Sequence, residues 1–149
     1  MKKRLFSNSA EEVAVDLIGR TMERKGGREY ISGVIRETGA YEEGNETPSR
    51  SGMKYAPGTI FLMPFRGSSL LNIATDREGY PSCVEIREVQ FEDEMVTGSG
   101  AIAKFLSLSD LDGAILGDEL SITGKPVNPS LIKRIEGSPE NCLGYFLLK

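Results

Sequence analysis

Short strand-like runs separated by glycine and proline dominate this sequence and restrict it to a sheet-rich fold. Gly26-Gly27 separates the first two runs, residues 20–25 and 29–41, in the pattern of a β-hairpin. Further runs cover residues 59–63, 70–74, 82–89, 118–123, 131–135 and 144–148. Strands in this kind of succession, with helices between them, are typical of an α+β fold with a mostly antiparallel sheet. The length of 149 residues suits one domain spanning residues 1–149.

Helices are predicted at two places. Ser9 and Glu12 form the Ser-x-x-Glu pattern of a capping box. Behind them, apolar residues recur at helical spacing through Ile18, and Met22 continues the pattern. Gly98-Ser99-Gly100 introduces a short helix over 101–106, whereas residues 42–58 are typical of a loop.

The absence of histidine excludes whole classes of chemistry. Ser-His-Asp and Cys-His catalysis both need an imidazole. With only Cys83 and Cys142 available, a zinc site is also disfavoured, and we expect two separate thiols, no disulfide, no metal and no cofactor. Any chemistry must therefore rest on carboxylates, lysine, tyrosine, arginine or backbone groups.

Hydropathy and charge bear on the location and the partners of the protein. No apolar run is long enough to span a membrane, and the basic start Met1-Lys2-Lys3-Arg4 is followed by no signal-peptide core. We therefore expect a cytoplasmic protein that is not secreted.

The net charge is −4, but residues 47–75 contain no acidic residue and include Arg50, Lys54 and Arg66. This segregation is compatible with one basic face for nucleic acid, and equally with chance.

Two short motifs offer other interpretations. Ser51-x-x-Lys54 and Ser130-x-x-Lys133 match the Ser-x-x-Lys pattern of some hydrolases, without supporting context. Gly98-x-Gly100-x-x-Ala103 resembles a dinucleotide fingerprint but lacks a surrounding βαβ unit. Such a glycine-rich helix entrance can hold one phosphate or be a plain turn.

Several segments, taken in order, carry a more specific signal. They are Leu17-Ile18-Gly19-Arg20, Gly33 to Tyr41, Pro57-Gly58-Thr59, Gly67, Asn72-Ile73, Val84-Glu85-Ile86-Arg87, Gly98-Ser99-Gly100, Asp118-Glu119-Leu120 and Lys133-Arg134-Ile135. Together they resemble successive segments of the 3-methyladenine (alkylpurine) DNA glycosylases, over most of the chain. The resemblance implies a curved antiparallel sheet and a monomeric, metal-free enzyme. Such an enzyme extrudes a damaged purine from double-stranded DNA and hydrolyses its glycosidic bond, a step impossible inside the base stack.

The resemblance also implies roles for particular residues. Tyr41 matches the tyrosine that stacks on the extruded base, Asn72 the asparagine that discriminates among purines, and Arg87 the arginine that helps hold the water. Met63 stands where a second stacking tyrosine is expected. At the DNA-facing positions, Arg66 with Phe65 replaces the wedge tyrosine, Arg50 replaces a histidine, and Ala101 replaces a lysine. Lys54 adds a positive charge to this surface.

The largest departure is at the catalytic glutamate, which aligns with Gly39. Glycine cannot serve as the general base, which contributes about 10²–10⁴-fold to such a reaction. Glu37 lies two residues earlier on the strand, about 6.5–7 Å away at strand rise, and is the expected replacement. Glu42 and Glu43 are further candidates in the following loop.

Three hypotheses follow. The first is a DNA-repair glycosylase for alkylated purines, with Glu37 and Arg87 as catalytic residues. The second is a non-catalytic nucleic-acid or nucleobase binder that kept the fold and lost the base at Gly39. The third is an unrelated small hydrolase that uses Ser51 and Lys54. Base release from alkylated duplex DNA separates the first two.

Overall fold

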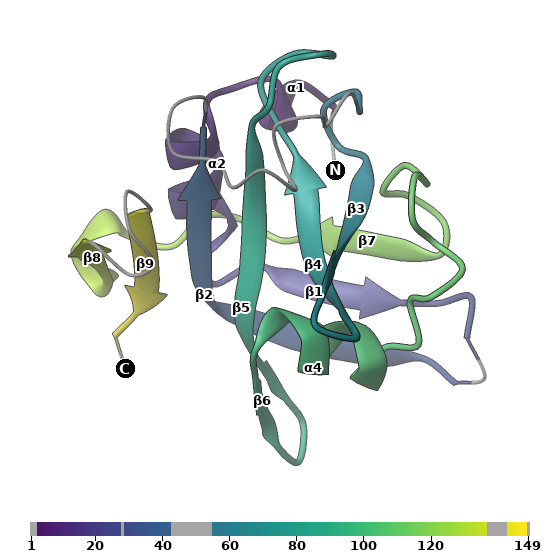
Figure 1. Ribbon diagram of the computed structural model, residues 1–149. Helices are drawn as coiled ribbons and strands as arrows, with labels where there is room; N and C mark the ends of the chain where they lie inside the picture. Colours follow the sequence, from purple (N-terminus) through teal and green to yellow (C-terminus); the bar gives the residue numbers. More distant parts are fainter. Residues whose placement is uncertain (1–2, 28, 43–54, 137–142, 149) are drawn as a thin grey trace.

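An antiparallel sheet that curls around a main apolar core forms the body of the molecule in the computed structural model (Figure 1). The structure describes residues 3–27, 29–42, 55–136 and 143–148. Within these ranges the sheet has nine strands, and β3, β4, β5, β2, β1 and β7 follow one another along it. On the outer side of β2, its neighbour is β9, which in turn pairs with β8, while β6 pairs with β5. The prediction of an α+β fold with a curved, mostly antiparallel sheet is confirmed.

The elements agree with the sequence pattern in most places. The strands are β1 (Thr21–Arg24), β2 (Ile31–Tyr41), β3 (Ile60–Phe65), β4 (Ser68–Ala74), β5 (Cys83–Phe91), β6 (Met95–Thr97), β7 (Leu120–Thr123), β8 (Ile132–Glu136) and β9 (Leu143–Leu147). The helices are α1 (Lys3–Phe6), α2 (Ala10–Leu17), α4 (Ser99–Phe105) and the 3-10 turn η1 (Pro129–Leu131). The predicted hairpin of β1 and β2 is confirmed, whereas α1 and β6 were not expected from the sequence.

The first helix is shorter than its apolar spacing indicates. It ends at Leu17, because Ile18 already has extended dihedral angles and Gly19 follows with φ +83°. Only glycine adopts such a positive φ at little cost, so the chain turns there into β1. Met22 is consequently a buried strand residue and not part of the helix.

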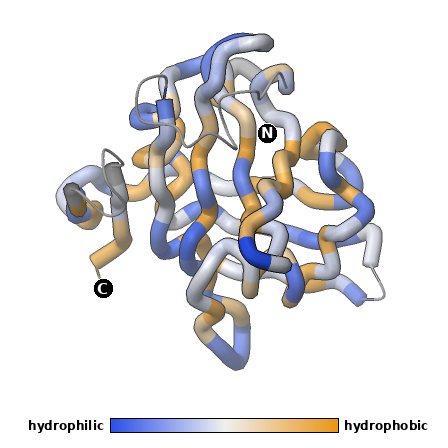
Figure 2. Tube along the Cα trace, in the orientation of Figure 1, coloured by the Kyte–Doolittle hydropathy of each residue, from blue (hydrophilic) through white to orange (hydrophobic). Residues whose placement is uncertain are grey.

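Helix α2 closes one face of the sheet over the main core. The faces of β2 and β5 that point toward it carry apolar residues of the core, including Ile35, Ala40, Val84 and Ile86. The Thr38 hydroxyl donates a hydrogen bond of 2.8 Å to the Ala14 carbonyl and ties the helix to β2. Figure 2 shows these strands alternating between hydrophobic and hydrophilic residues, as expected when one side of a sheet is buried against a core.

Helix α4 covers the other end of the sheet, beside the hairpin of β3 and β4 (Figure 1). Its buried residues Ile102 and Ala103 join the main core. Among the described residues, no helix has the length and apolar character needed to cross a bilayer.

The capping box of α2 makes a first testable prediction. The Ser9 hydroxyl accepts from the Glu12 amide at 3.2 Å, and the Glu12 carboxylate accepts from the Ser9 amide at 3.3 Å. Replacing a capping serine with alanine leaves helix amides unpaired, so Ser9→Ala is expected to lower the free energy of unfolding by about 1 kcal/mol in urea denaturation. Ser7→Ala, an exposed serine outside the helix, is the matched control and should change it little. Equal effects of the two variants would contradict the role of the cap.

Candidate functional site

A row of cross-strand partners runs across the sheet on the face opposite α2. Asn72 on β4 pairs with Glu85 on β5, Glu85 pairs with Gly39 on β2, and Gly39 pairs with Gly144 on β9. Side chains of directly paired residues lie on the same face of a sheet. The row therefore presents an amide, a carboxylate and then two positions without side chains.

The Glu85 carboxylate organises this face. Its Oε1 accepts hydrogen bonds from Arg87 Nε at 3.0 Å and from the Tyr41 hydroxyl at 3.2 Å. Its Oε2 accepts from the Ser99 hydroxyl at 2.6 Å, which connects the first turn of α4 to β5. A carboxylate that is only 9% exposed needs such partners, because burial of an unpaired charge is costly. We refer to Glu85, Arg87, Tyr41 and Ser99 as the Glu85 network.

The guanidinium of Arg87 lies over the two glycines. A Cβ atom placed at Gly39 would be 2.4 Å from Arg87 Cζ, and one placed at Gly144 would be 3.0 Å from Arg87 Nη1. Arg87 Nη2 also donates to the Tyr41 hydroxyl at 3.0 Å. Gly39 does not have a positive φ, so crowding by Arg87, and not backbone conformation, is what opposes a side chain at this position.

Glu37 lies beside this network without belonging to it. Its Oε2 is 4.0 Å from Arg87 Nη1, the outer limit of an ion pair, and its side chain is 27% exposed. Burial raises the pKa of the Glu37 carboxyl above its ordinary value, although the positive charge of Arg87 acts in the opposite direction. Glu88 and Glu85 on β5 raise the pKa further by repulsion. Glu37 is thus a carboxylate of increased basicity next to a cation.

The residues predicted to contact the base are buried. Tyr41 and Met63 belong to a small apolar cluster with Phe61, and both are about as buried as the main core. Asn72 is fully buried, where its Nδ2 donates to the Leu70 carbonyl at 3.0 Å and its Oδ1 accepts from the Cys83 thiol. The structure thus places Met63 on β3, Asn72 on β4 and Tyr41 on β2 on the same side of the sheet as the Glu85 network, with β5 between the last two.

The predicted DNA-facing residues divide into two groups. Phe65 and Arg66 lie at the turn between β3 and β4, where Phe65 is 49% exposed and the Arg66 guanidinium is 5.1 Å from the centre of its ring. Arg66 and Gly67 both have positive φ, which a two-residue type I′ hairpin turn requires. Arg50 and Lys54 lie outside the described residues.

The alternative motifs receive little support from the described part of the chain. Ser51 and Lys54 lie outside it, and Ser130 and Lys133 are exposed on η1 and β8. The glycine-rich entrance of α4 follows an antiparallel strand, and its serine hydroxyl is engaged with Glu85. The dinucleotide interpretation is therefore not supported.

Sequence reasoning did not identify Glu85 or Ser99 as site residues. The alternation within Val84-Glu85-Ile86-Arg87 was a usable signal, because it places Glu85 on the same face as Arg87. The link between Ser99 and β5 has no comparable local signal.

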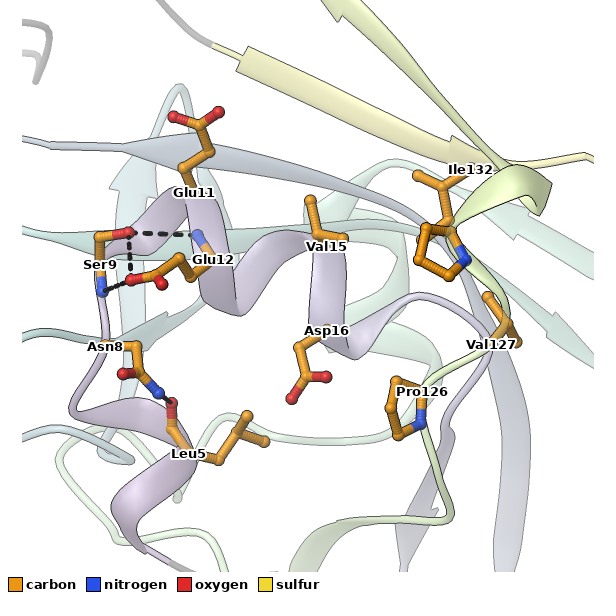
Figure 3. A pocket seen from close by; sticks show the side chains of 11 residues that line it. Leu5, Asn8, Ser9, Glu11, Glu12, Val15, Asp16, Pro126, Val127 and Ile132 are labelled. Carbon is orange, nitrogen blue, oxygen red and sulfur yellow. Dashed lines mark hydrogen bonds between the residues drawn. The ribbon is translucent and has the colours of Figure 1, made fainter.

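A separate cavity of about 710 Å³ lies between α2 and the segment around η1. Figure 3 shows Leu5, Asp16 and Pro126 around this space, with the capping box of Ser9 and Glu12 at its edge. None of the residues predicted for catalysis or DNA binding lines it. It lies on the helix-covered side of the sheet, away from the Glu85 network.

The crowding at Gly39 is directly testable. Gly39→Ala should lower the free energy of unfolding by about 1–3 kcal/mol in urea denaturation, because the added methyl group would displace the Arg87 guanidinium from its hydrogen bonds to Glu85 and Tyr41. The matched control is the same change in an Arg87→Ala/Glu85→Gln background, which removes the obstructing group without leaving either charge buried alone. There the cost should largely disappear. The same cost in both backgrounds would place the obstruction elsewhere.

Comparison with known proteins adds independent information. The family model for methylpurine-DNA glycosylase (MPG) matches residues 4–135. A protein of Lactiplantibacillus plantarum named "Putative 3-methyladenine DNA glycosylase" is 29% identical over 96 residues, which are 58% of this chain and 46% of the relative. A protein of the same name from Trichodesmium erythraeum is 37% identical over 91 residues, covering 54% and 45%.

The chain therefore matches less than half the length of these relatives. The family model nevertheless spans nearly all of the sheet described above, from α1 to β8. This chain belongs to the methylpurine-DNA glycosylase family.

Proposed function

We propose that this protein releases alkylated purines of the 3-methyladenine type from double-stranded DNA. The base is extruded from the duplex, water attacks the sugar carbon, and the N-glycosidic bond breaks with the base as the leaving group. Family membership and the names of the relatives support this class of reaction. A monomer in the cytoplasm, associated with the nucleoid, is part of the same proposal.

The observation on which the catalytic part of the proposal depends is the position of Glu37. Water is a poor nucleophile and needs a base to accept its proton. Glu37 offers a carboxylate with a raised pKa, and it is partly accessible. By contrast, both oxygens of Glu85 already accept hydrogen bonds from Arg87, Tyr41 or Ser99, so this carboxylate is engaged in holding the network together.

Within this proposal, Glu85 is a positioning residue. It binds Arg87 through Nε at 3.0 Å and so holds the guanidinium at the limit of ion-pair distance from Glu37. The cation can then stabilise negative charge near the reacting water while the Glu37 carboxylate stays available. Phe65 and Arg66 would enter the space that an extruded base leaves, a role supported by their position on an exposed turn.

A second candidate is a binder of DNA or nucleobases without catalysis. It is favoured by the Arg87 guanidinium, which occupies the space that a side chain at Gly39 would need. The burial of the Tyr41 ring also favours this candidate, because an extruded base reaches the ring only after the groups that cover it move apart. Base release by the wild-type protein separates the two candidates.

The role of Glu37 predicts both a rate and a pH profile. On duplex DNA containing 3-methyladenine, Glu37→Gln should lower the rate of base release by about 10²–10⁴-fold. For the wild type, the rate should fall as the pH is lowered, with a midpoint above the ordinary pKa of a glutamate, since the protonated form cannot accept a proton. Glu92→Gln, on an exposed turn, is the control and should leave the rate unchanged.

Each outcome assigns the function differently. No base release by the wild type, together with preferential binding of the damaged duplex, would establish the non-catalytic binder. If Glu37→Gln leaves the release of the purine unaffected, the general base is another carboxylate.

A further inference from the structure

A second cavity lies between the β3–β4 turn and α4, outside the Glu85 network. It is a cavity of about 360 Å³ lined by Ser68, Ser69, Lys104 and Ser109 and, on its apolar side, by Leu62 and Ala103. Figure 1 shows the turn of this hairpin next to α4, and Figure 2 shows the turn as a hydrophilic segment. The cavity is thus built by the same hairpin that presents Phe65 and Arg66.

The lining has the donor groups that a phosphate needs. In the part of the chain that the structure describes, Lys104 makes no ion pair and the hydroxyls of the three serines make no hydrogen bond. None of the residues that line the cavity is acidic, and Asp110, which follows Ser109, is not among them. An ammonium group and several hydroxyl donors, all without partners, are typical of contacts to phosphate oxygens.

The packing of α4 on β4 fixes the geometry of the lining. A Cβ atom placed at Gly100 would be 3.3 Å from Ser68 Cβ, so the helix approaches the strand closely at that point. Gly100 and Lys104 are four residues apart and lie on the same side of the helix. Lys104 is therefore directed along the side of α4 that faces Ser68.

We propose that this cavity binds a phosphate group of the DNA backbone through Lys104 and the serine hydroxyls. The inference rests on the proposed function for the source of the phosphate, but the cavity's chemistry is independent of Glu37. Its position beside the exposed tip places the bound strand next to Phe65 and Arg66. Arg66, one residue before Gly67, adds a second positive charge near the same edge.

The test measures binding of a fluorescent DNA duplex by anisotropy at salt concentrations between about 50 and 200 mM. Lys104→Gln should weaken binding roughly tenfold and lower the slope of log K against log salt by about one unit. Ser69→Asp should weaken it further, because a carboxylate repels the phosphate. Lys125→Gln, at another exposed lysine, after β7, is the matched control and should change neither quantity. An unchanged slope for Lys104→Gln would overturn the proposal.

A second measurement separates this proposal from the proposed function. Inorganic phosphate is titrated into ¹⁵N-labelled protein, and the amide signals of Ser68, Ser69 and Lys104 are followed by NMR. Shifts confined to these residues in a protein that does not bind DNA would support the phosphate site and reject the DNA function. Absence of any shift, together with absence of DNA binding, would reject both.

Discussion

The antiparallel ladder between β2 and β5 is the constraint on which the rest of the molecule depends. Its alternation sends one set of side chains into the core beneath α2 and the other set to the face that bears the Glu85 network. The ladder has two register shifts, on either side of Glu37, which is paired with Glu88. Extra residues of this kind redirect side chains and are frequent next to functional sites. One strand pair thereby specifies both the stability of the fold and the geometry of its chemistry.

On the polar face, the buried carboxylate is on β5 at Glu85, and the facing position on β2 has no side chain. Gly39 is the position on β2 where the resemblance predicts a carboxylate, and its direct partner on β5 is Glu85. The space above Gly39 and Gly144 is taken by Arg87, which Glu85 holds. Glu85 and Arg87 form a largely buried ion pair, and burying either charge without the other would cost several kcal/mol. The substitution at Gly39 is therefore coherent with the surrounding residues.

Much of the fold could be predicted from the sequence because its signals are local. The capping box at Ser9, the glycines between β1 and β2 and the alternation within β5 each act within a few residues. The helical spacing extended too far at Met22, which lies beyond the turn at Gly19 in β1, within the strand-like run 20–25 that was also predicted. The role of Glu85 could not be predicted, since its pairing with Gly39 requires β5 to lie beside β2 in one particular register, and no local pattern specifies either. Contacts such as that between Ser99 and Glu85 arise only from tertiary packing.

The turn between β3 and β4 has a consequence for the energetics of association. Arg66 and Gly67 are held in left-handed backbone conformations by the paired strands on either side, at Phe65 and Ser68. A segment fixed in this way before it meets a partner has little backbone entropy left to lose. The adjoining Phe65 has only two side-chain torsions, so fixing its side chain also costs little conformational entropy. Contacts made by this tip therefore retain most of their free energy as affinity, in contrast to those of a long flexible loop.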